Sequence, residues 1–165
     1  MTQSNANLYA SFQNIFSQHA DKVALTTTTD TTYCYGDLDR ESARLAGFLS
    51  GLGLQSGDRV SVQVQKSPEA LCLYLACLRG GFVFHPLNTG YRESELEYFL
   101  SDAEPGAIIC DESAEDVMQR LADKLGIGNL LILNVDGGGS LIEKSRDTSD
   151  EFEIASCKSD DMAAL

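Results

Sequence analysis

The feature that most constrains the fold of this chain is a regular alternation of short apolar runs with amphipathic segments between Val60 and Val135. The runs are rich in Val, Ile, Leu and Phe, and the segments between them carry apolar residues at helical spacing. Strands that alternate with helices need crossover connections, which give a parallel sheet covered by helices. The sequence therefore predicts an α/β fold. Strands are expected at residues 60–64, 82–84, 107–110 and 130–135, and helices at residues 68–79, 93–101 and 114–125.

The residues before this layer have a different pattern. Apolar residues from Leu8 to Phe16 follow helical spacing, and the VALTTTTDTTYCY run after them is rich in Thr and Tyr, which favour strands. A small β-hairpin that turns near Asp30 is expected here. A further leucine-faced helix follows and ends in GLGLQSG. We divide the chain into a helix and hairpin (1–35), an α/β layer (36–135) and a final segment (136–165).

Two glycine-rich stretches could suggest phosphate binding, but neither has the required context. GLGLQSG has the spacing G-x-G-x-x-x-G and follows a helix, which indicates a helix C-cap and turn. In the final segment, no Lys-Ser/Thr pair directly follows the DGGGS glycines, so a flexible surface loop is expected. The closing DDMAAL, two aspartates before an apolar run, is typical of the start of another strand.

The charge balance excludes several partners. Twelve Lys and Arg against 25 Asp and Glu give a formal charge of −13, which repels nucleic acid and acidic lipid. The scattered carboxylates indicate solvated helix faces rather than a cation site. No signal peptide opens the chain, and the longest apolar run, residues 70–78, is far short of the ~20 residues a bilayer span needs. We expect a cytoplasmic protein without nucleic-acid or membrane partners.

The loop of residues 65–67 is the one candidate for ligand binding. Ser67 is a favoured N-cap, Pro68 suits the first helical position, and Glu69 lies in the first turn, so capping accounts for these residues. The loop also leaves the carboxyl end of a parallel strand, where α/β sheets bind ligands. Lys66 and Ser67 are therefore the candidate cofactor-binding residues, although we favour the capping interpretation.

The remaining reactive residue types indicate no catalytic or metal site. Neither histidine, His19 or His85, has a partner at metal-ligand spacing, and His85 precedes Pro86, which imposes an extended backbone. A structural or exposed role is expected for both. The five cysteines form no C-x-x-C pair and lie mostly in apolar stretches, so reduced, buried thiols are expected. No G-x-S-x-G nucleophile motif occurs.

Several motifs occur in a fixed order between residues 33 and 111. A Tyr-x-x-Leu motif begins at Tyr35, Gly-Asp-Arg-Val begins at Gly57, and residues 78–88 follow the pattern L-R-A-G-x-x-x-x-P-L-N. With these motifs the chain resembles the amino-terminal part of the adenylate-forming acyl-CoA synthetases. KSPEA, PLNTGY, ELEYFLSDAEP and DDMAAL most resemble the malonyl-CoA synthetases. Three positions depart from the usual pattern, namely Cys34 for Thr or Ser, Gly80 for Ala, and His85 for an apolar or aromatic residue.

The resemblance implies a ligase that converts an acid, ATP and CoA to an acyl-CoA, AMP and pyrophosphate, with Mg²⁺ offsetting phosphate charge. Malonate is the implied acid, and fatty acid metabolism is the implied context. The family's phosphate loop and catalytic residues follow the position of Leu165, so this chain is expected to be an amino-terminal fragment that is inactive alone. No catalytic or metal-binding role is carried to any residue here.

Other interpretations stay open from the sequence. The chain could be a non-catalytic binding or regulatory α/β module complete at residue 165. A flavodoxin-like domain is less consistent, since no phosphate loop follows the first strand. Because the helix at residues 68–79 is apolar nearly all round and the chain closes on an apolar run, we also expect exposed apolar surface and self-association.

Overall fold

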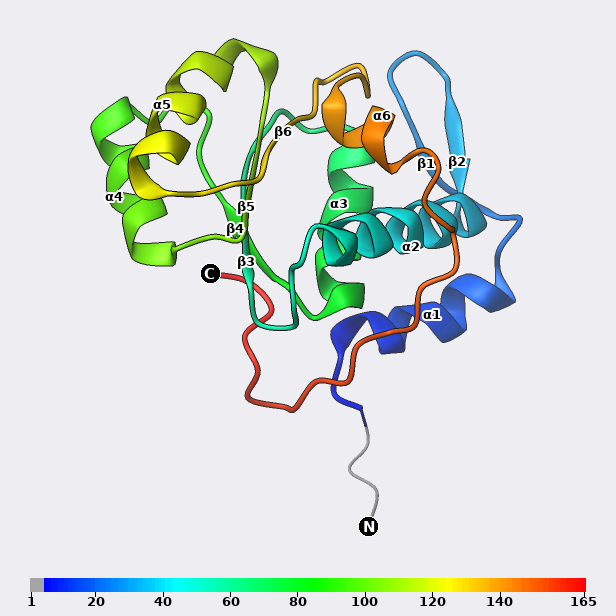
Figure 1. Cartoon of the computed structure of the whole chain (residues 1–165). Helices are drawn as coiled ribbons and strands as arrows, with labels where there is room; N and C mark the ends of the chain where they lie inside the picture. The colour runs from blue at the N-terminus through cyan, green and yellow to red at the C-terminus, as the bar shows by residue number, and fades with distance from the viewer. Residues whose placement is uncertain (1–4) are drawn as a thin grey trace.

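The computed structural model describes residues 5–165, and it has a parallel four-stranded sheet with helices on both faces (Figure 1). The order of the strands is β4-β3-β5-β6, and a separate antiparallel pair, β1-β2, precedes them. This arrangement confirms the predicted α/β fold with a small hairpin. The strands are β1 Val23–Thr26, β2 Thr32–Cys34, β3 Arg59–Gln63, β4 Val83–Pro86, β5 Ala107–Cys110 and β6 Leu130–Ile132. The helices are α1 Leu8–Gln18, α2 Tyr35–Gly51, α3 Pro68–Gly80, α4 Glu93–Ala103, α5 Glu115–Leu125 and α6 Ser140–Ser145, with a 3₁₀ turn at Glu112–Ala114.

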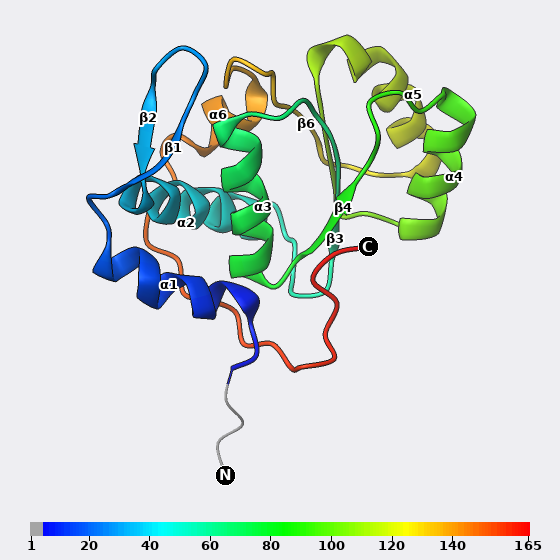
Figure 2. The same ribbon diagram turned by 180° about the vertical axis from the view of Figure 1, so that it is seen from behind.

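The strand order places the helices in two layers. The chain passes from β3 through α3 to β4, then returns across β3 to β5 and continues to β6. Because right-handed crossovers that run in opposite directions lie on opposite faces, α3 covers one face and α4 and α5 cover the other (Figure 2). Each face has its own apolar core, the larger one built with α2 and α3 and the smaller one with α4 and α5.

Helix α3 begins and ends as its sequence predicts. The Ser67 hydroxyl accepts a hydrogen bond from the Ala70 amide at 3.1 Å, and Pro68 occupies the first turn. Gly81 ends the helix with φ of 69°, a left-handed conformation that glycine adopts at little cost. The interpretation of Ser67 as an N-cap is confirmed.

The expectation that α3 leaves an apolar face uncovered is wrong. Leu73, Ala76 and Cys77 are fully buried, because α1 and α2 pack over the side of α3 that faces away from the sheet. Only Leu71 among the α3 leucines has substantial exposure, at 39%. The leucine-faced helix α2 therefore supplies the cover that the sequence pattern of α3 requires.

The hairpin and the glycine turn also follow the sequence. In the hairpin Thr26 pairs with Thr32, the Thr27 amide donates to the Thr31 carbonyl at 2.8 Å, and Asp30 has φ of 60° in the turn. GLGLQSG closes α2 at Gly51 and turns at Gly53, whose φ is 100°. Strand β6 is shorter than predicted, because the chain turns after Leu133 with the Asn134 amide bonded to the Gly138 carbonyl at 2.8 Å.

Where the sequence predicts a flexible loop, after residue 135, the structure forms helix α6 instead. Leu141 is fully buried in the larger core, which gives the glycine-rich segment a packing partner that its composition does not reveal. The chain then runs past α2 and α1 to the edge of β4 (Figure 1). There Ala164 forms a parallel bridge with Phe84. Among residues 5–165, no helix is long and apolar enough to cross a membrane.

Candidate functional site

The carboxyl edge of the sheet is the place where this topology can bind a ligand. The strand order reverses between β3 and β5, and ligands of open α/β sheets bind outside the carboxyl ends at such a point. Beside this edge lies a groove of about 670 Å³, which we call the hairpin groove. It lies between the hairpin, the start of α3 and the loop after β6, and its lining includes Leu25, Tyr33, Lys66, Ser67 and Asp136.

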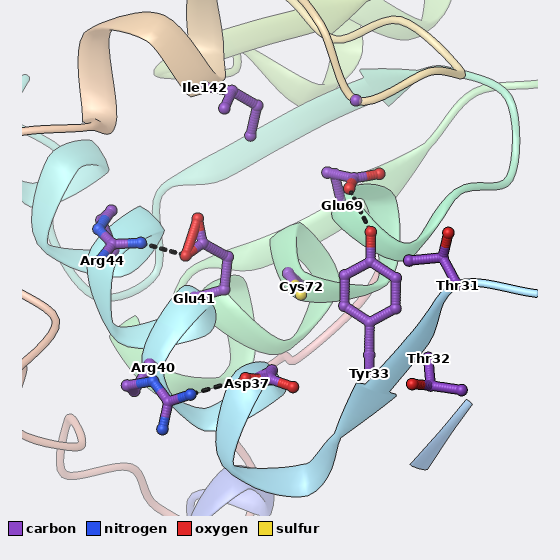
Figure 3. Close-up of a pocket in the computed structure, with 11 residues that line it drawn as sticks. Thr31, Thr32, Tyr33, Asp37, Arg40, Glu41, Arg44, Glu69, Cys72 and Ile142 are labelled. Atoms are coloured by element: carbon purple, nitrogen blue, oxygen red, sulfur yellow. Dashed lines mark hydrogen bonds and ion pairs between the residues drawn. The ribbon is translucent and has the colours of Figure 1, made fainter. Parts of the chain in front are cut away.

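A second cavity, of about 400 Å³, adjoins the hairpin groove and shares Tyr33 and Glu69 with it (Figure 3). The Tyr33 hydroxyl, from the hairpin, donates to Glu69 Oε1 at 3.2 Å. Two ion pairs along α2 form the opposite wall: Arg40 with Asp37 at 2.6 Å, and Arg44 with Glu41. The Cys72 side chain lies between these walls.

The Cys72 thiol and the Tyr33 hydroxyl of this second cavity are held in their neutral forms. The pKa of the Cys72 thiol is raised to about 12 by burial, and further by Glu41, Glu69 and Asp37. The pKa of Tyr33 is also raised, first by burial and then by Glu69. Burial is the main cause of both shifts, and a thiol held in its protonated form is a poor nucleophile. Cys72 is therefore unsuited to thiolate chemistry.

The structure places both candidate cofactor-binding residues on the wall of the hairpin groove. Lys66 is exposed there and is the one cation among the groove-lining residues. The Ser67 hydroxyl is already engaged as the α3 cap by the Ala70 amide. That bond uses the Ser67 oxygen as an acceptor and leaves its O–H able to donate, so both residues have a donor for an anionic ligand and only Lys66 adds a positive charge. A binding role for either residue stays a prediction.

His85 has a structural role in this sheet. In the parallel register Ser61 lies beside His85, and the Ser61 hydroxyl and His85 Nδ1 are hydrogen-bonded at 2.8 Å. Both residues are buried, and burial lowers the pKa of the imidazole, which keeps it neutral at pH 7. A buried, hydrogen-bonded pair of this kind is a satisfied core interaction. No sequence pattern indicates this pair, because 24 positions separate its members.

Metal-ligand groups are also scarce in the structure. Within residues 5–165, no three His, Cys, Asp or Glu side chains lie together so that they could hold a metal ion. Cys72, Cys77 and Cys110 are buried, and burial raises the pKa of all three thiols. Sequence reasoning missed the cavity residues Tyr33 and Glu69, since only folding brings the hairpin against α3.

The comparison with known protein families decides the assignment. The AMP-binding enzyme family matches residues 12–165. The chain belongs to this family. Its resemblance to the adenylate-forming acyl-CoA synthetases is thereby confirmed.

Individual members of the AMP-binding family show how much of the chain is shared. ATP-bound MatB from Rhodopseudomonas palustris is 41% identical, with a TM-score of 0.89 over 98% of this chain and 32% of that one. The acyl-CoA ligase YtcI of Bacillus subtilis is 34% identical over 91% of this chain and 29% of its own length. The medium-chain fatty-acid–CoA ligase of Escherichia coli is 34% identical over 59% of this chain and 17% of its own. The chain thus spans a third or less of each of these three relatives.

Proposed function

We propose that this chain is the amino-terminal part of an ATP-dependent acyl-CoA synthetase whose acid substrate is malonate. The observation that carries the proposal is the likeness to ATP-bound MatB along nearly the whole chain. The CoA-ligase relatives support the reaction class. Malonate is supported by the stretches KSPEA, PLNTGY and ELEYFLSDAEP, which resemble the malonyl-CoA synthetases.

The proposed reaction has two displacement steps. A carboxylate oxygen of malonate attacks the α-phosphorus of ATP, a new P–O bond forms, and pyrophosphate leaves to give the acyl-adenylate. The CoA thiolate then attacks the acyl carbon and AMP leaves. Mg²⁺ would offset the phosphate charge when it is bound. We assign no residue of this chain to the metal, because residues 5–165 offer no three-ligand group for one.

The chain's own contribution in this proposal is a scaffold and one candidate phosphate contact. The sheet and its helices hold the hairpin groove at the carboxyl edge, where Lys66 supplies a positive charge. No catalytic role is proposed for any residue. The alternative is a non-catalytic binding or regulatory module, which would bind a ligand without turning it over.

The test of the function is ATP–pyrophosphate exchange in the presence of Mg²⁺. The 165-residue chain alone should give no exchange above a blank, because positioning and charge stabilisation of ATP supply most of the rate in such transfers. The product of the full reading frame should catalyse exchange with malonate roughly tenfold or more faster than with acetate, which lacks the second carboxylate. Exchange by the chain alone would contradict its proposed inactivity. A full-length product without exchange would favour the binding module, and one that prefers acetate would exclude malonate.

We also propose that the isolated chain self-associates in the cytoplasm through its apolar chain end, residues 162–165, which lies along the edge of β4. This surface carries the exposed side chains Met162 and Leu165, which are 55% and 53% exposed. Burial of apolar area there, together with pairing of the free edge of residues 163–165, would stabilise a dimer. Sedimentation velocity at micromolar concentration should show a dimer whose fraction falls in a Leu165→Ser variant. A monomer at all concentrations would refute the proposal.

A further inference from the structure

The segment between α6 and the end of the chain is held by side chains from distant elements. We call residues 149–157 the strap. It has no helix or strand of its own and runs along α2 and α1 before the chain reaches the edge of β4 (Figures 1 and 2). Its Phe152 and Ile154 pack against the larger core. What fixes the strap along this path is therefore a question of its polar contacts.

The polar contacts of the strap come from residues 5–7 and from Arg79, in the last turn of α3. Arg79 Nε donates to the Phe152 carbonyl at 3.1 Å, and the Ala155 amide donates to the Arg79 carbonyl at 2.9 Å. Asn7 adds a bond from Nδ2 to the Ala155 carbonyl at 3.0 Å. The strap is thus bonded to both the side chain and the main chain of one residue.

The guanidinium of Arg79 is itself fixed from the other side. Nη1 donates to the Asp39 carbonyl at 2.7 Å and to Asp39 Oδ1 at 3.1 Å, and it also reaches Ser42 Oγ at 3.1 Å. The Tyr9 ring lies 4.7 Å from the guanidinium carbon, and its hydroxyl donates to Asp39 Oδ1 at 2.7 Å. With only 5% of its side chain exposed, Arg79 has one available orientation. Residues of α1 and α2 therefore determine where Nε points.

The strap leads directly to the edge of β4. The Phe84 amide donates to the Ala163 carbonyl at 3.0 Å, and the Leu165 amide donates to the Phe84 carbonyl at 3.1 Å. Arg79, in the last turn of α3, and Phe84, in β4, are joined by the short turn at Gly81. Few residues separate the anchored Ala155 from Ala163, which limits the positions on β4 that the chain can reach.

We propose that Arg79 is a positioning residue that sets where residues 163–165 pair with β4. Asp39 and Tyr9 orient the guanidinium of Arg79, and Nε of this group holds the strap at the Phe152 carbonyl. The position of the strap then determines which residues of the chain end pair with Phe84. This role goes beyond the proposed ligase function and does not depend on it. The competing interpretation is that Arg79 only stabilises the fold as a whole.

The test is residue-resolved hydrogen exchange in the 165-residue chain, with Arg79→Lys as the variant. Lysine keeps the charge but lacks the fork that reaches Phe152 and Asp39 together. The amides of Ala155, Phe84 and Leu165 should exchange about tenfold or more faster relative to core amides of β3 and β5, as expected for loss of a charged hydrogen bond. Met118→Ala, in the core on the opposite face, is the matched control and should raise all rates in parallel.

A second variant covers the case in which Arg79→Lys does not fold. Asn7→Ser keeps an N-cap oxygen for α1 but cannot reach the Ala155 carbonyl, and it should selectively raise exchange at the same three amides. If exchange at Phe84 and Leu165 follows the core amides in both variants, Arg79 is a global stabiliser and the proposal is overturned. The proposal is also overturned if the exchange rates of the Phe84 and Leu165 amides do not change in either variant.

Discussion

The Phe82→Ala variant is expected to lose about 3–5 kcal/mol of the free energy of unfolding. Phe82 is 2% exposed, in the turn that joins α3 to β4, and its ring lies against the backbone of Gly80. A Cβ placed on Gly80 would lie only 2.4 Å from Phe82 Cε2. Truncation of this buried ring to a methyl group would leave a cavity beside Gly80. Urea titration followed by circular dichroism measures the change in midpoint and slope.

The partner variant Gly80→Ala distinguishes packing from a general loss of stability. In the native background it should cost about 1–3 kcal/mol, because the new methyl group overlaps the Phe82 ring. In the Phe82→Ala background the overlap is gone, and alanine should stabilise the end of α3 by up to about 1 kcal/mol over glycine. A reversal of sign is the expected result, and additive effects would contradict it.

The second large effect is expected at Leu73 in helix α3. Leu73 is fully buried between the sheet and α2, so Leu73→Ala should lower the free energy of unfolding by about 2–5 kcal/mol. Leu71→Ala, the same substitution on the same helix, is the matched control. Because Leu71 is 39% exposed, its truncation should cost less than about 1 kcal/mol.

The comparison of these two leucines also tests the cover that α2 and α1 give to α3. Equal and large losses of the free energy of unfolding would mean that Leu71 is also buried in solution. Equal and small losses would mean that α2 does not pack on α3 in solution. Denaturant unfolding of both variants under one set of conditions separates these outcomes.

Much of the fold was predictable because it depends on local chemistry. The Ser67-Pro68-Glu69 sequence determines the start of α3, and Gly81 determines its end. The alternation of apolar runs and helical stripes gave the parallel sheet, and the Thr-rich run gave the hairpin. Helix α6 was missed, since its burial rests on Leu141 reaching a core built by residues far away in the sequence.

The candidate site was predictable only at Lys66 and Ser67, whose place after a parallel strand follows from topology. The cavity beside them depends on the bond from Tyr33 to Glu69, which are 36 positions apart. The two residues belong to different supersecondary units, so no periodicity or motif relates them. The same holds for the buried pair of Ser61 and His85, which only the register of β3 against β4 brings together.

The sequence by itself determined every strand and every α-helix except α6, the order of these elements and the family, because periodicity, capping residues and motifs act over a few neighbouring positions. The tertiary structure alone decided which polar groups meet. Arg79 reads in the sequence as an ordinary cation at a helix C-terminus, yet in the fold it is buried among Tyr9, Asp39 and the Phe152 carbonyl. A buried guanidinium is tolerated only where its donors are satisfied, and here the partners come from three other segments up to 73 positions away. That set of partners exists only when all the layers are packed together.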